Sequence, residues 1–597
     1  MNSLKLRYTA LAASMTIIPA VAAQQNDSPD DPSLTKEIKV EREVEPLIRE
    51  AKRLNLSPEI SLSPFNKTNL TYSDRTITAR IPSTFSLLEP AAYLDSVPRA
   101  PWRGYVAGGY FPTFNAALSA GYRIIDTERS NLDIWMQYDG TRYSVKADDN
   151  SYARYSNTLQ LGTKLHTLIG TKSALDLTLN YLVDRFRYPA FINSSFIQFG
   201  EEPVHKMHQT VNNVEFAAGF TSKVNDLNYK LRFAYNHFGY AQSGIWPRFE
   251  IEDYPYNSDY LNPVRENHIT IGGNLNEIVD LNLSVISNSR RSITDYPFLT
   301  VDDPFKPDKN YNHALLTLTP GYTFATNNLT LGVRARVDLT FNSGKFFHIA
   351  PDVDFSWRPA NILTIWAKIG GGEWQNTLLS LYEVSELSQP MMAYKNSHIP
   401  LTVDAGVTAG PFEGGWIKLY GGYARANDWL MPAVTSPGIL SFHALDIKGF
   451  HGGVAMGYNY RDFAEIEMKF EGAPTGLRKG YYLWRDRAGQ VFDLKISAKP
   501  LKPLTVSASW QLRANRSVCF PEYFDFSSSD NIHTTVETTV TNRLNNLSLI
   551  NIGGNWQFNN RFGVFVTLEN ILGRHTTDVD LLPGQGFHGL VGASYKF

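Results

Sequence analysis

The chain has 597 residues, a formal net charge of −2 at pH 7 and a single cysteine, Cys519. The near-zero charge, with no basic cluster, argues against a nucleic-acid-binding surface, and one cysteine cannot form an internal disulfide framework. Aromatic residues make up 13% of the chain and glycine is frequent, with 42 residues. This combination is typical of strand-rich proteins with aromatic belts.

The N-terminus has the features of a cleaved signal peptide over residues 1–23. Lys5 and Arg7 precede a short apolar core, and Ala20, Ala22 and Ala23 supply the small residues of a cleavage site. We therefore expect an exported protein. Beyond this segment no apolar run approaches the roughly 18 residues that a membrane helix requires, so a mature chain in a membrane would cross it as strands.

From about residue 103 onward, apolar and polar residues alternate with a period of two. In residues 329–341, apolar positions from Leu329 to Phe341 alternate with polar ones that include Arg334, Arg336 and Asp338. Many such segments reach the length of about nine to eleven residues that a tilted membrane strand needs, whereas strands of soluble proteins average roughly five or six. One apolar and one charged face suit a barrel with lipid outside and water inside.

The expected fold is all-β: a transmembrane antiparallel β-barrel of about 22 strands over residues 103–597, preceded by a short N-terminal extension. The predicted strands lie near 103–111, 114–125, 131–146, 150–168, 173–188, 205–222, 227–243, 265–276, 280–292, 310–325, 328–343, 345–357, 362–374, 398–409, 415–427, 444–460, 462–474, 488–498, 503–515, 545–558, 561–572 and 586–597.

The connections alternate in length, as they do in a membrane barrel. The predicted periplasmic turns include 170–173, 225–226, 326–328, 358–361 and 559–561, and the predicted surface loops include 189–204, 244–264, 293–309, 375–397, 428–443 and 516–544. Outward-facing aromatic residues precede the turns and are predicted to form a girdle at the membrane boundary: Tyr322, Phe324, Trp357, Tyr458, Tyr460, Trp556 and Phe558.

The C-terminal sequence resembles the carboxyl end of TonB-dependent receptors. The likeness lies in Asn570, Ile571 and Gly573, in the pair Pro583 and Gly584 before the last strand, and in the terminal Phe597. It covers the barrel and is most like the receptor-like barrels of the Bacteroidota. The resemblance implies a Gram-negative outer-membrane protein with a transport or receptor role for a nutrient. It also implies that the insertion machinery reads the terminal aromatic residues, here Tyr595 and Phe597. Because an open strand edge cannot survive in lipid, we expect the last strand to pair with the first.

Receptors of this family carry a plug domain before the barrel, and residues 24–102 are too short to supply one. We therefore expect the usual plug to be missing, with this extension in the lumen or the periplasm. Glu37–Glu43 is similar to a TonB box, as any short acidic strand would be, so coupling to TonB stays open. A lumen of about 22 strands is too wide for wall side chains to fill. We expect residues 24–100, the long loops or a partner protein to close it.

No sequence grouping indicates a catalytic centre, so we expect no enzyme activity, no cofactor and no metal site. Two predicted surface loops are instead dense in aromatic residues. The candidate contacts for a ligand or a partner are Trp246, Phe249, Tyr254, Tyr256, Tyr260, Phe520, Tyr523 and Phe524. The alternative is that these loops pack on each other and cap the pore.

Two functions remain open at this stage. The first is transport or reception of a nutrient, which the resemblance implies. The second is a structural or assembly scaffold, in which a plugless barrel docks a surface lipoprotein or other subunits. Both place the chain in outer-membrane lipid through the insertion machinery.

Overall fold

The computed structural model describes residues 102–147, 150–188, 208–224, 227–241, 263–276, 278–290, 312–388, 394–436, 439–461, 463–473, 488–526, 533–575, 577 and 582–597. These residues form strands and one short helix, α2 (Leu378–Val384). The strands are β1 Gly104–Phe111, β2 Asn115–Asp126, β3 Ser130–Ala147, β4 Asn150–Ile169, β5 Ser173–Arg187, β6 His208–Val224, β7 Leu227–Tyr240, β8 Val264–Leu275, β9 Val279–Arg290, β10 Asn312–Ala325, β11 Leu329–Phe341, β12 Phe347–Ala360, β13 Leu363–Trp374, β14 Ser397–Ala409, β15 Gly415–Ser436, β16 Ile439–Tyr460, β17 Ala464–Gly472, β18 Ala488–Leu501, β19 Leu504–Phe526, β20 His533–Leu544, β21 Leu547–Gln557, β22 Phe562–Glu569 and β23 His588–Lys596.

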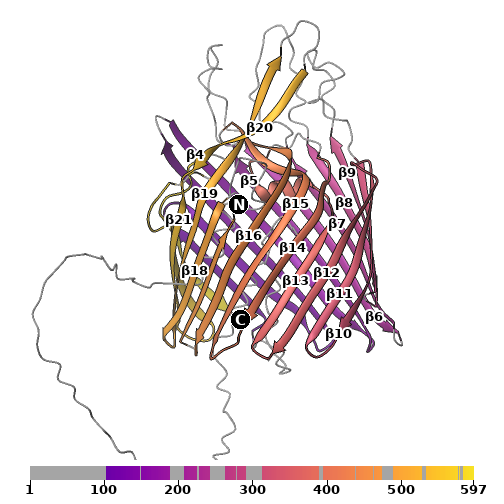
Figure 1. Cartoon of the computed structure of the whole chain (residues 1–597). Coiled ribbons are helices and arrows are strands. Elements are labelled where there is room, and N and C mark those ends of the chain that lie inside the picture. The colour runs from indigo at the N-terminus through magenta and orange to yellow at the C-terminus, as the bar shows by residue number, and fades with distance from the viewer. Residues whose placement is uncertain are drawn as a thin grey trace, which may run out of the picture. The chain divides into compact units, whose positions relative to one another are not determined.

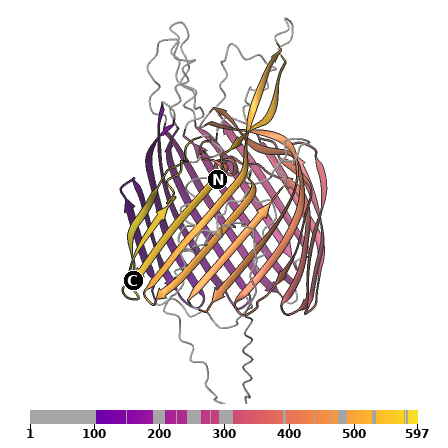
Figure 2. The same cartoon turned by 60° about the vertical axis from the view of Figure 1, so that its left-hand side comes forward.

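Twenty-two of these strands form a closed antiparallel wall (Figures 1 and 2), which confirms the predicted fold class. Wall neighbours follow the chain order, and β23 pairs with β1 from Tyr105↔Lys596 to Tyr110↔Val591. At this seam Gly104 N donates to Phe597 O at 2.8 Å and Phe597 N donates to Gly104 O at 2.9 Å. The predicted pairing of the last strand with the first is therefore confirmed, and closure satisfies the backbone groups that lipid could not.

The remaining strand, β20, pairs with β19 beyond the wall. β21 pairs with β19 from Leu504 to Arg513, whereas β20 pairs with β19 from Arg516 to Phe526. The two strands form a hairpin that rises past the end of the barrel (Figure 1).

The two ends of the barrel differ in their connections. At the end that we call the turn end, ten connections have only two to five residues, as at 127–129, 225–226 and 410–414. The opposite end, which we call the loop end, carries the longer connections, such as 188–207 and 241–263. This alternation is the one predicted from the sequence, and it follows from the hairpin geometry of a membrane barrel.

The outer face of the wall is apolar and exposed. Large apolar side chains on it include Leu231 and Val333, which are 53% and 50% exposed. Exposure of this kind is stable where lipid, not water, is the surrounding solvent. The predicted girdle residues are all exposed near the turn end, from Trp556 at 37% to Tyr322 at 66%, where aromatic rings meet the boundary between hydrocarbon and water. Among the described residues, the single helix is too short to cross a membrane.

The inner face carries charges that pair with one another. Arg334 Nε lies 2.8 Å from Asp352 Oδ2 on the next strand. Arg513 Nη1 lies 2.8 Å from Asp493 Oδ1, also on a neighbouring strand. These pairs agree with the mixed-sign, hydrated interior that the sequence predicts.

Two predicted surface loops are strands instead. Residues 428–443 hold the end of β15, which runs to Ser436, and the start of β16 at Ile439. Residues 516–544 hold the end of β19 and all of β20. The bilayer sets a minimum length for a strand but no maximum. A hairpin partner keeps satisfying backbone hydrogen bonds past the membrane boundary, so pairing continues there.

The predictions for the N-terminus fall outside the described residues. They concern the signal peptide over residues 1–23, the extension over residues 24–102, of which only Trp102 is described, and the segment Glu37–Glu43.

Candidate functional site

The β13–β14 connection, residues 375–396, is called the inward loop below, and the structure describes its residues 375–388 and 394–396. It brings helix α2 onto the inner face of β5 to β8. Its helix α2 begins at the N-cap Thr377, whose Oγ1 accepts from Ser380 N at 3.0 Å, while Ser380 Oγ accepts from Thr377 N at 3.0 Å. Leu378 N donates to Glu266 Oε1 of β8 at 3.0 Å. Because the first N–H groups of a helix lack intrahelical partners and the dipole favours an anion there, a wall carboxylate holds the start of this helix.

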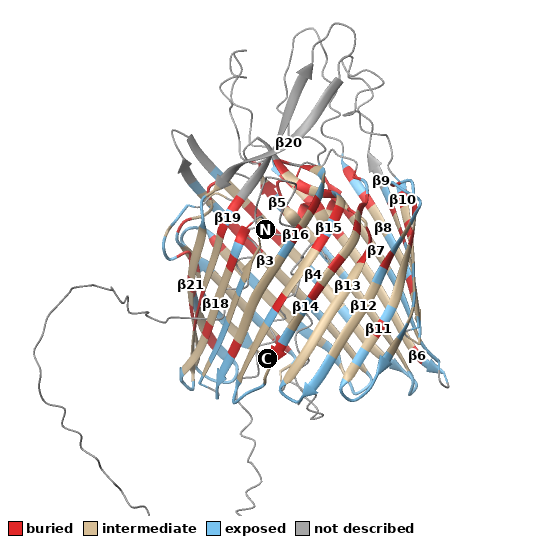
Figure 3. Ribbon diagram, viewed as in Figure 1, coloured by how far each residue is buried: buried red, intermediate tan, exposed pale blue. Residues whose placement is uncertain are grey.

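An apolar seat on the inner face of β5 to β8 receives the helix. Its side chains are at most 2% exposed: Phe186, Val211, Phe238, Tyr240 and Val264. They pack in one cluster with Leu378, Leu381, Tyr382 and Leu387 of the inward loop. Full burial of one such side chain contributes about 1.5–3 kcal/mol. Buried residues accordingly gather toward the loop end of the barrel (Figure 3), and the loop is docked on the wall.

A buried polar anchor lies beside the apolar seat. Arg154 of β4 donates from Nη2 to Glu386 Oε1 at 2.7 Å, and the Glu386 side chain is 2% exposed. Tyr382 Oη donates to Asp184 Oδ2 of β5 at 2.5 Å, and Thr158 Oγ1 donates to Asp184 Oδ1 at 3.0 Å. Burial raises the pKa of Tyr382 well above its ordinary range, so this hydroxyl keeps its proton and stays a donor. The anchor fixes the loop in one position, because its polar groups lose their partners if the loop leaves.

Two further segments cover the docked loop. Leu440 at the start of β16 donates its N–H to Leu387 O at 3.2 Å, and the ring of Phe442 makes an edge contact with Tyr394, with centroids 6.1 Å apart. From the β22–β23 connection, Leu582 joins the same apolar cluster at 5% exposure. The mouth of the lumen is therefore narrowed from several sides of the barrel.

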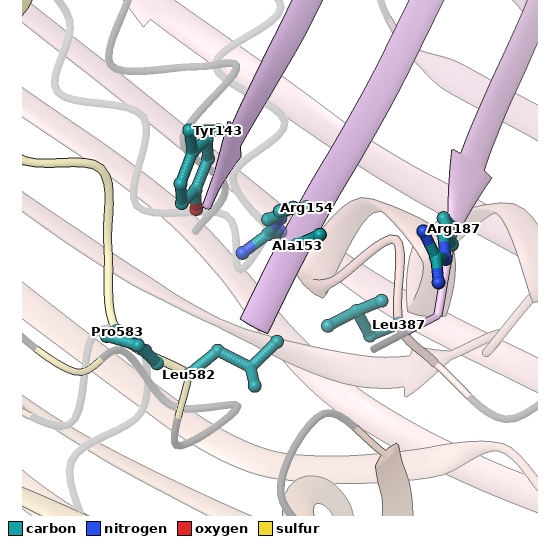
Figure 4. A pocket seen from close by; sticks show the side chains of 7 residues that line it. All are labelled: Tyr143, Ala153, Arg154, Arg187, Leu387, Leu582 and Pro583. Carbon is teal, nitrogen blue, oxygen red and sulfur yellow. The ribbon is translucent and has the colours of Figure 1, made fainter. Parts of the chain in front are cut away.

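A pocket opens beside the anchor (Figure 4). It is lined by Tyr143, Ala153, Arg154, Arg187, Leu387, Leu582 and Pro583, and it is a small recess with room for about one water molecule. Arg154 is neutralised by Glu386. Arg187, by contrast, has no acidic partner among the described residues, and its buried Nε makes no hydrogen bond there. Within the described part of the chain, the pocket thus presents one guanidinium group without an acidic partner.

The motif that carries the family resemblance shapes the connection that reaches this pocket. Asn570 has a positive φ of 47°, and its Nδ2 donates to Arg574 O at 2.8 Å and to Gln585 O at 3.0 Å. Gly573 also has a positive φ, of 62°, a conformation that favours glycine. These two residues close the β22–β23 connection on itself, and this positions Leu582 and Pro583 at the pocket.

The predicted site residues have different outcomes. The loop aromatics Trp246, Phe249, Tyr254, Tyr256 and Tyr260 lie outside the described residues, as do the side chains of Phe520, Tyr523 and Phe524, whose backbone belongs to β19. Tyr595 and Phe597 are exposed on the outer face at the seam, with stacked rings 6.3 Å apart. Their role as an insertion signal stays a prediction.

The sequence reading missed the apolar seat, although a signal for it exists. On β7 the inward set from Asn228 to Asn236 is polar apart from Ala234, and its last two members are Phe238 and Tyr240. Aromatic residues at the end of a polar lumenal face indicate that something packs there. The sequence does not show that α2 is the segment that packs there, because α2 is short and the strands that it contacts are far away in the sequence.

A second lumenal group lies at the root of the inward loop. It consists of His348, Glu373 and His398. Within the described ranges, these are the histidine, cysteine and carboxylate side chains that come together in a group of three with ligand atoms close enough to hold one metal ion. The sequence reading did not find it, because the three residues come from three different strands.

Comparisons with known proteins agree with the architecture. No family model matches the sequence, and no curated protein matches it either. Solved structures do resemble it. The siderophore receptor PirA from Acinetobacter baumannii has 10% sequence identity and a TM-score of 0.59, over 83% of this chain and 80% of that one. A mutant of the ferric enterobactin receptor PfeA from Pseudomonas aeruginosa has 9% identity and a TM-score of 0.56, over 83% and 80%.

The FrpB iron transporter from Neisseria meningitidis has 10% identity and a TM-score of 0.56, over 84% of this chain and 81% of that one. At this level of identity the likeness concerns the fold. The chain shares the barrel fold of these two receptors and this transporter.

Proposed function

We propose that the chain is an outer-membrane receptor or transport barrel that takes a nutrient ligand from its loop end. The observation that carries the proposal is the docked inward loop, which narrows a wide polar lumen and leaves Arg187 beside a small recess at its mouth. A scaffold would need only the outer wall, whereas a receptor needs a formed site at the entrance. The barrel fold shared with iron and siderophore receptors and an iron transporter supports the same function.

The pocket favours an anionic ligand. Arg187 has no acidic partner among the described residues, and Tyr143 adds an aromatic ring at the same pocket. A charged and planar guanidinium group is suited to carboxylate, phosphate and similar anionic oxygens. Ferric siderophores are the first class to test, since one protein of similar fold is named a ferric enterobactin receptor.

Arg187→Met should weaken binding of an anionic chelate by about 10- to 100-fold, because a charge-assisted hydrogen bond contributes roughly 1.5–3 kcal/mol. The measurement is quenching of tryptophan fluorescence of the purified full-length chain by ferric enterobactin and by neutral iron chelates of similar size. The matched control is Arg185→Met, an exposed arginine on the same strand that does not line the pocket. No binding of any chelate to the unaltered chain, or equal binding by all three proteins, would count against an anion-binding mouth.

The proposal includes the location predicted from the sequence. Residues 1–23 direct export, the turn end faces the periplasm, and the chain belongs to the outer membrane of a Gram-negative bacterium of the Bacteroidota. Energy coupling through TonB is part of the same proposal, supported by the C-terminal motif and by the shared fold.

One observation favours the scaffold as a second candidate. The β19–β20 hairpin extends past the wall and pairs its two strands from Arg516↔Leu544 to Phe526↔His533, which offers a surface for a docking protein. Affinity purification from membranes, with and without residues 519–541, distinguishes the candidates. A stoichiometric partner that is lost with the hairpin favours the scaffold, and a solitary barrel favours the receptor.

A further inference from the structure

Three side chains at the loop end of the lumen converge on one point. His348 is on β12, Glu373 on β13 and His398 on β14. His348 Nε2 lies 3.2 Å from Glu373 Oε1, and His398 Nδ1 lies 2.9 Å from the same oxygen. The two imidazole rings have centroids 4.2 Å apart. The three ligand atoms all lie within 4.8 Å of one another.

The fold of β13 brings this group together. Pairing of β12 with β13 ends at Val353↔Ile369, and beyond it Glu373 reaches β11, two strands away. Glu373 N donates to Asp338 Oδ2 at 2.7 Å, and Arg336 Nη2 donates to Glu373 O at 2.7 Å. Since β12 lies between β11 and β13 in the wall, the end of β13 crosses the inner face of β12. A register shift between Gly370 and Gly372 marks the departure.

Glycine is required where β13 crosses. Gly372 has a φ of +121°, and a Cβ atom there would lie 2.4 Å from Arg336 Nε. The backbone of Glu373 is therefore held from both sides, by Arg336 and by Asp338, while its side chain is aimed at the two histidines. Such outer contacts orient the ligands of metal sites in proteins.

Hydrogen bonds do not explain why the Glu373 carboxylate lies so close to the two histidines. Glu373 is 5% exposed, yet its Oε1 makes no hydrogen bond within the described residues, and neither does His398 Nδ1, although the two atoms lie 2.9 Å apart. Their alignment is wrong for a shared proton. His348 Nε2 also lies 3.0 Å from Lys345 O, which takes its proton when the imidazole is neutral. A carboxylate oxygen buried without a hydrogen bond is costly unless a cation faces it.

We propose that His348, Glu373 and His398 bind one divalent transition-metal ion of the zinc class. Two imidazoles with one carboxylate form a known zinc donor set, and they leave a fourth position for water or a ligand. With bonds of about 2.0–2.1 Å, tetrahedral donors lie roughly 3.3 Å apart, close to the 2.9 and 3.2 Å found between donor atoms here. The His398 side chain is 23% exposed, so the site is reached from the lumen.

The ion would also fix the root of the inward loop. Glu373 precedes residues 375–396 and His398 follows them, so one ion ties the two ends of the loop to β12. Metal binding at Nε2 would require the neutral tautomer of His348 that carries its proton on Nδ1. This role goes beyond uptake of a nutrient and does not depend on it.

The test uses the purified full-length chain without a polyhistidine tag, stripped of metal by a chelator. Zinc is titrated in competition with a chromophoric chelator, and Co²⁺ is added separately to read its tetrahedral absorption bands. We expect one ion per chain. His348→Ala and His398→Ala should each weaken zinc binding by at least about 100-fold, since loss of an outer-shell contact alone costs 10- to 100-fold. Glu373→Gln keeps the side-chain size and should lower affinity strongly.

The matched control is His451→Ala. His451 also faces a carboxylate in the barrel, with Nε2 2.9 Å from Asp404 Oδ1, but it has no second histidine in its group. Its zinc binding should equal that of the unaltered chain. Heat-modifiable gel mobility confirms that each variant is a folded barrel. Absence of a stoichiometric zinc site in the unaltered chain, or equal zinc affinity in the folded His348, Glu373 and His398 variants, would overturn the proposal.

Discussion

Arg154→Met should release the inward loop from the wall. The substitution leaves the Glu386 carboxylate buried at 2% exposure without its cation and close to Asp184. Breaking a buried ion pair by removing one partner costs about 3–5 kcal/mol. The population of the undocked loop should then rise by roughly 10²- to 10⁴-fold, because each 1.36 kcal/mol is a factor of ten. Hydrogen–deuterium exchange of peptides that cover residues 375–388 measures this rise directly.

Two further proteins make the result specific to the ion pair. The double variant Arg154→Met with Glu386→Gln removes both charges, so most of the lost protection should return. Arg123→Met breaks a more exposed pair with Asp133 near the turn end and should leave exchange in the loop unchanged. Equal exchange in the Arg154 variant and the unaltered chain would show that the anchor does not hold the loop.

Gly592→Val should prevent most molecules from closing the barrel. A Cβ atom at this position would lie 2.2 Å from Gly108 O and 2.7 Å from Gly109 Cα, both on β1 across the seam. Backbone atoms cannot yield as a flexible side chain does, so β23 cannot keep its register against β1. An unpaired edge is not tolerated in lipid. We expect a severalfold loss of the heat-modifiable form in outer-membrane fractions.

The matched substitution for the seam is Ala593→Val, which adds similar bulk to the exposed outer face of the same strand. It should leave the inserted amount nearly unchanged.

Deletion of Phe597 removes the reciprocal bonds to Gly104 and the ring stacked on Tyr122, with centroids 6.0 Å apart. It should therefore also lower insertion. Normal assembly of both the Gly592 and the Phe597 variants would contradict the importance of this seam.

The barrel wall could be predicted because the apolar and polar residues of each strand alternate according to the solvent that each face meets. The alternation in residues 329–341 reports lipid on one side and water on the other, whatever the strand pairs with. Turn lengths and the aromatic girdle gave independent support, since both depend on short segments of sequence. Strand ends beyond the membrane were harder. Nothing in 428–443 or 516–544 distinguishes a loop from a hairpin until its pairing partner is known.

The contacts that dock the inward loop, and the proposed metal ligands, could not be predicted from the alternation of residues. Arg154 and Glu386 are 232 positions apart, and their pairing depends on how far the inward loop reaches across the lumen. His348, Glu373 and His398 meet because β13 separates from β12 beyond Ile369 while it stays paired with β14. A period of two continues the wall past that point and gives no sign of the departure. Only the paired aromatics Phe238 and Tyr240, at the end of a polar face, indicated packing at the mouth.

Cysteine labelling in intact cells measures both the orientation of the barrel and the closure of its mouth. In a Cys519→Ser background, single substitutions Asn342→Cys at the loop end, Asn559→Cys at the turn end and Leu381→Cys in α2 are treated with a membrane-impermeant maleimide. Asn342 and Asn559 are exposed, whereas Leu381 is 5% exposed. We predict rapid labelling at position 342, labelling at 559 only after the outer membrane is permeabilised, and protection at 381 that is lost when Arg154→Met is added. Labelling at 381 as fast as at 342 in the otherwise unaltered barrel, or labelling at 559 in intact cells, would contradict an outward-facing mouth closed by the inward loop.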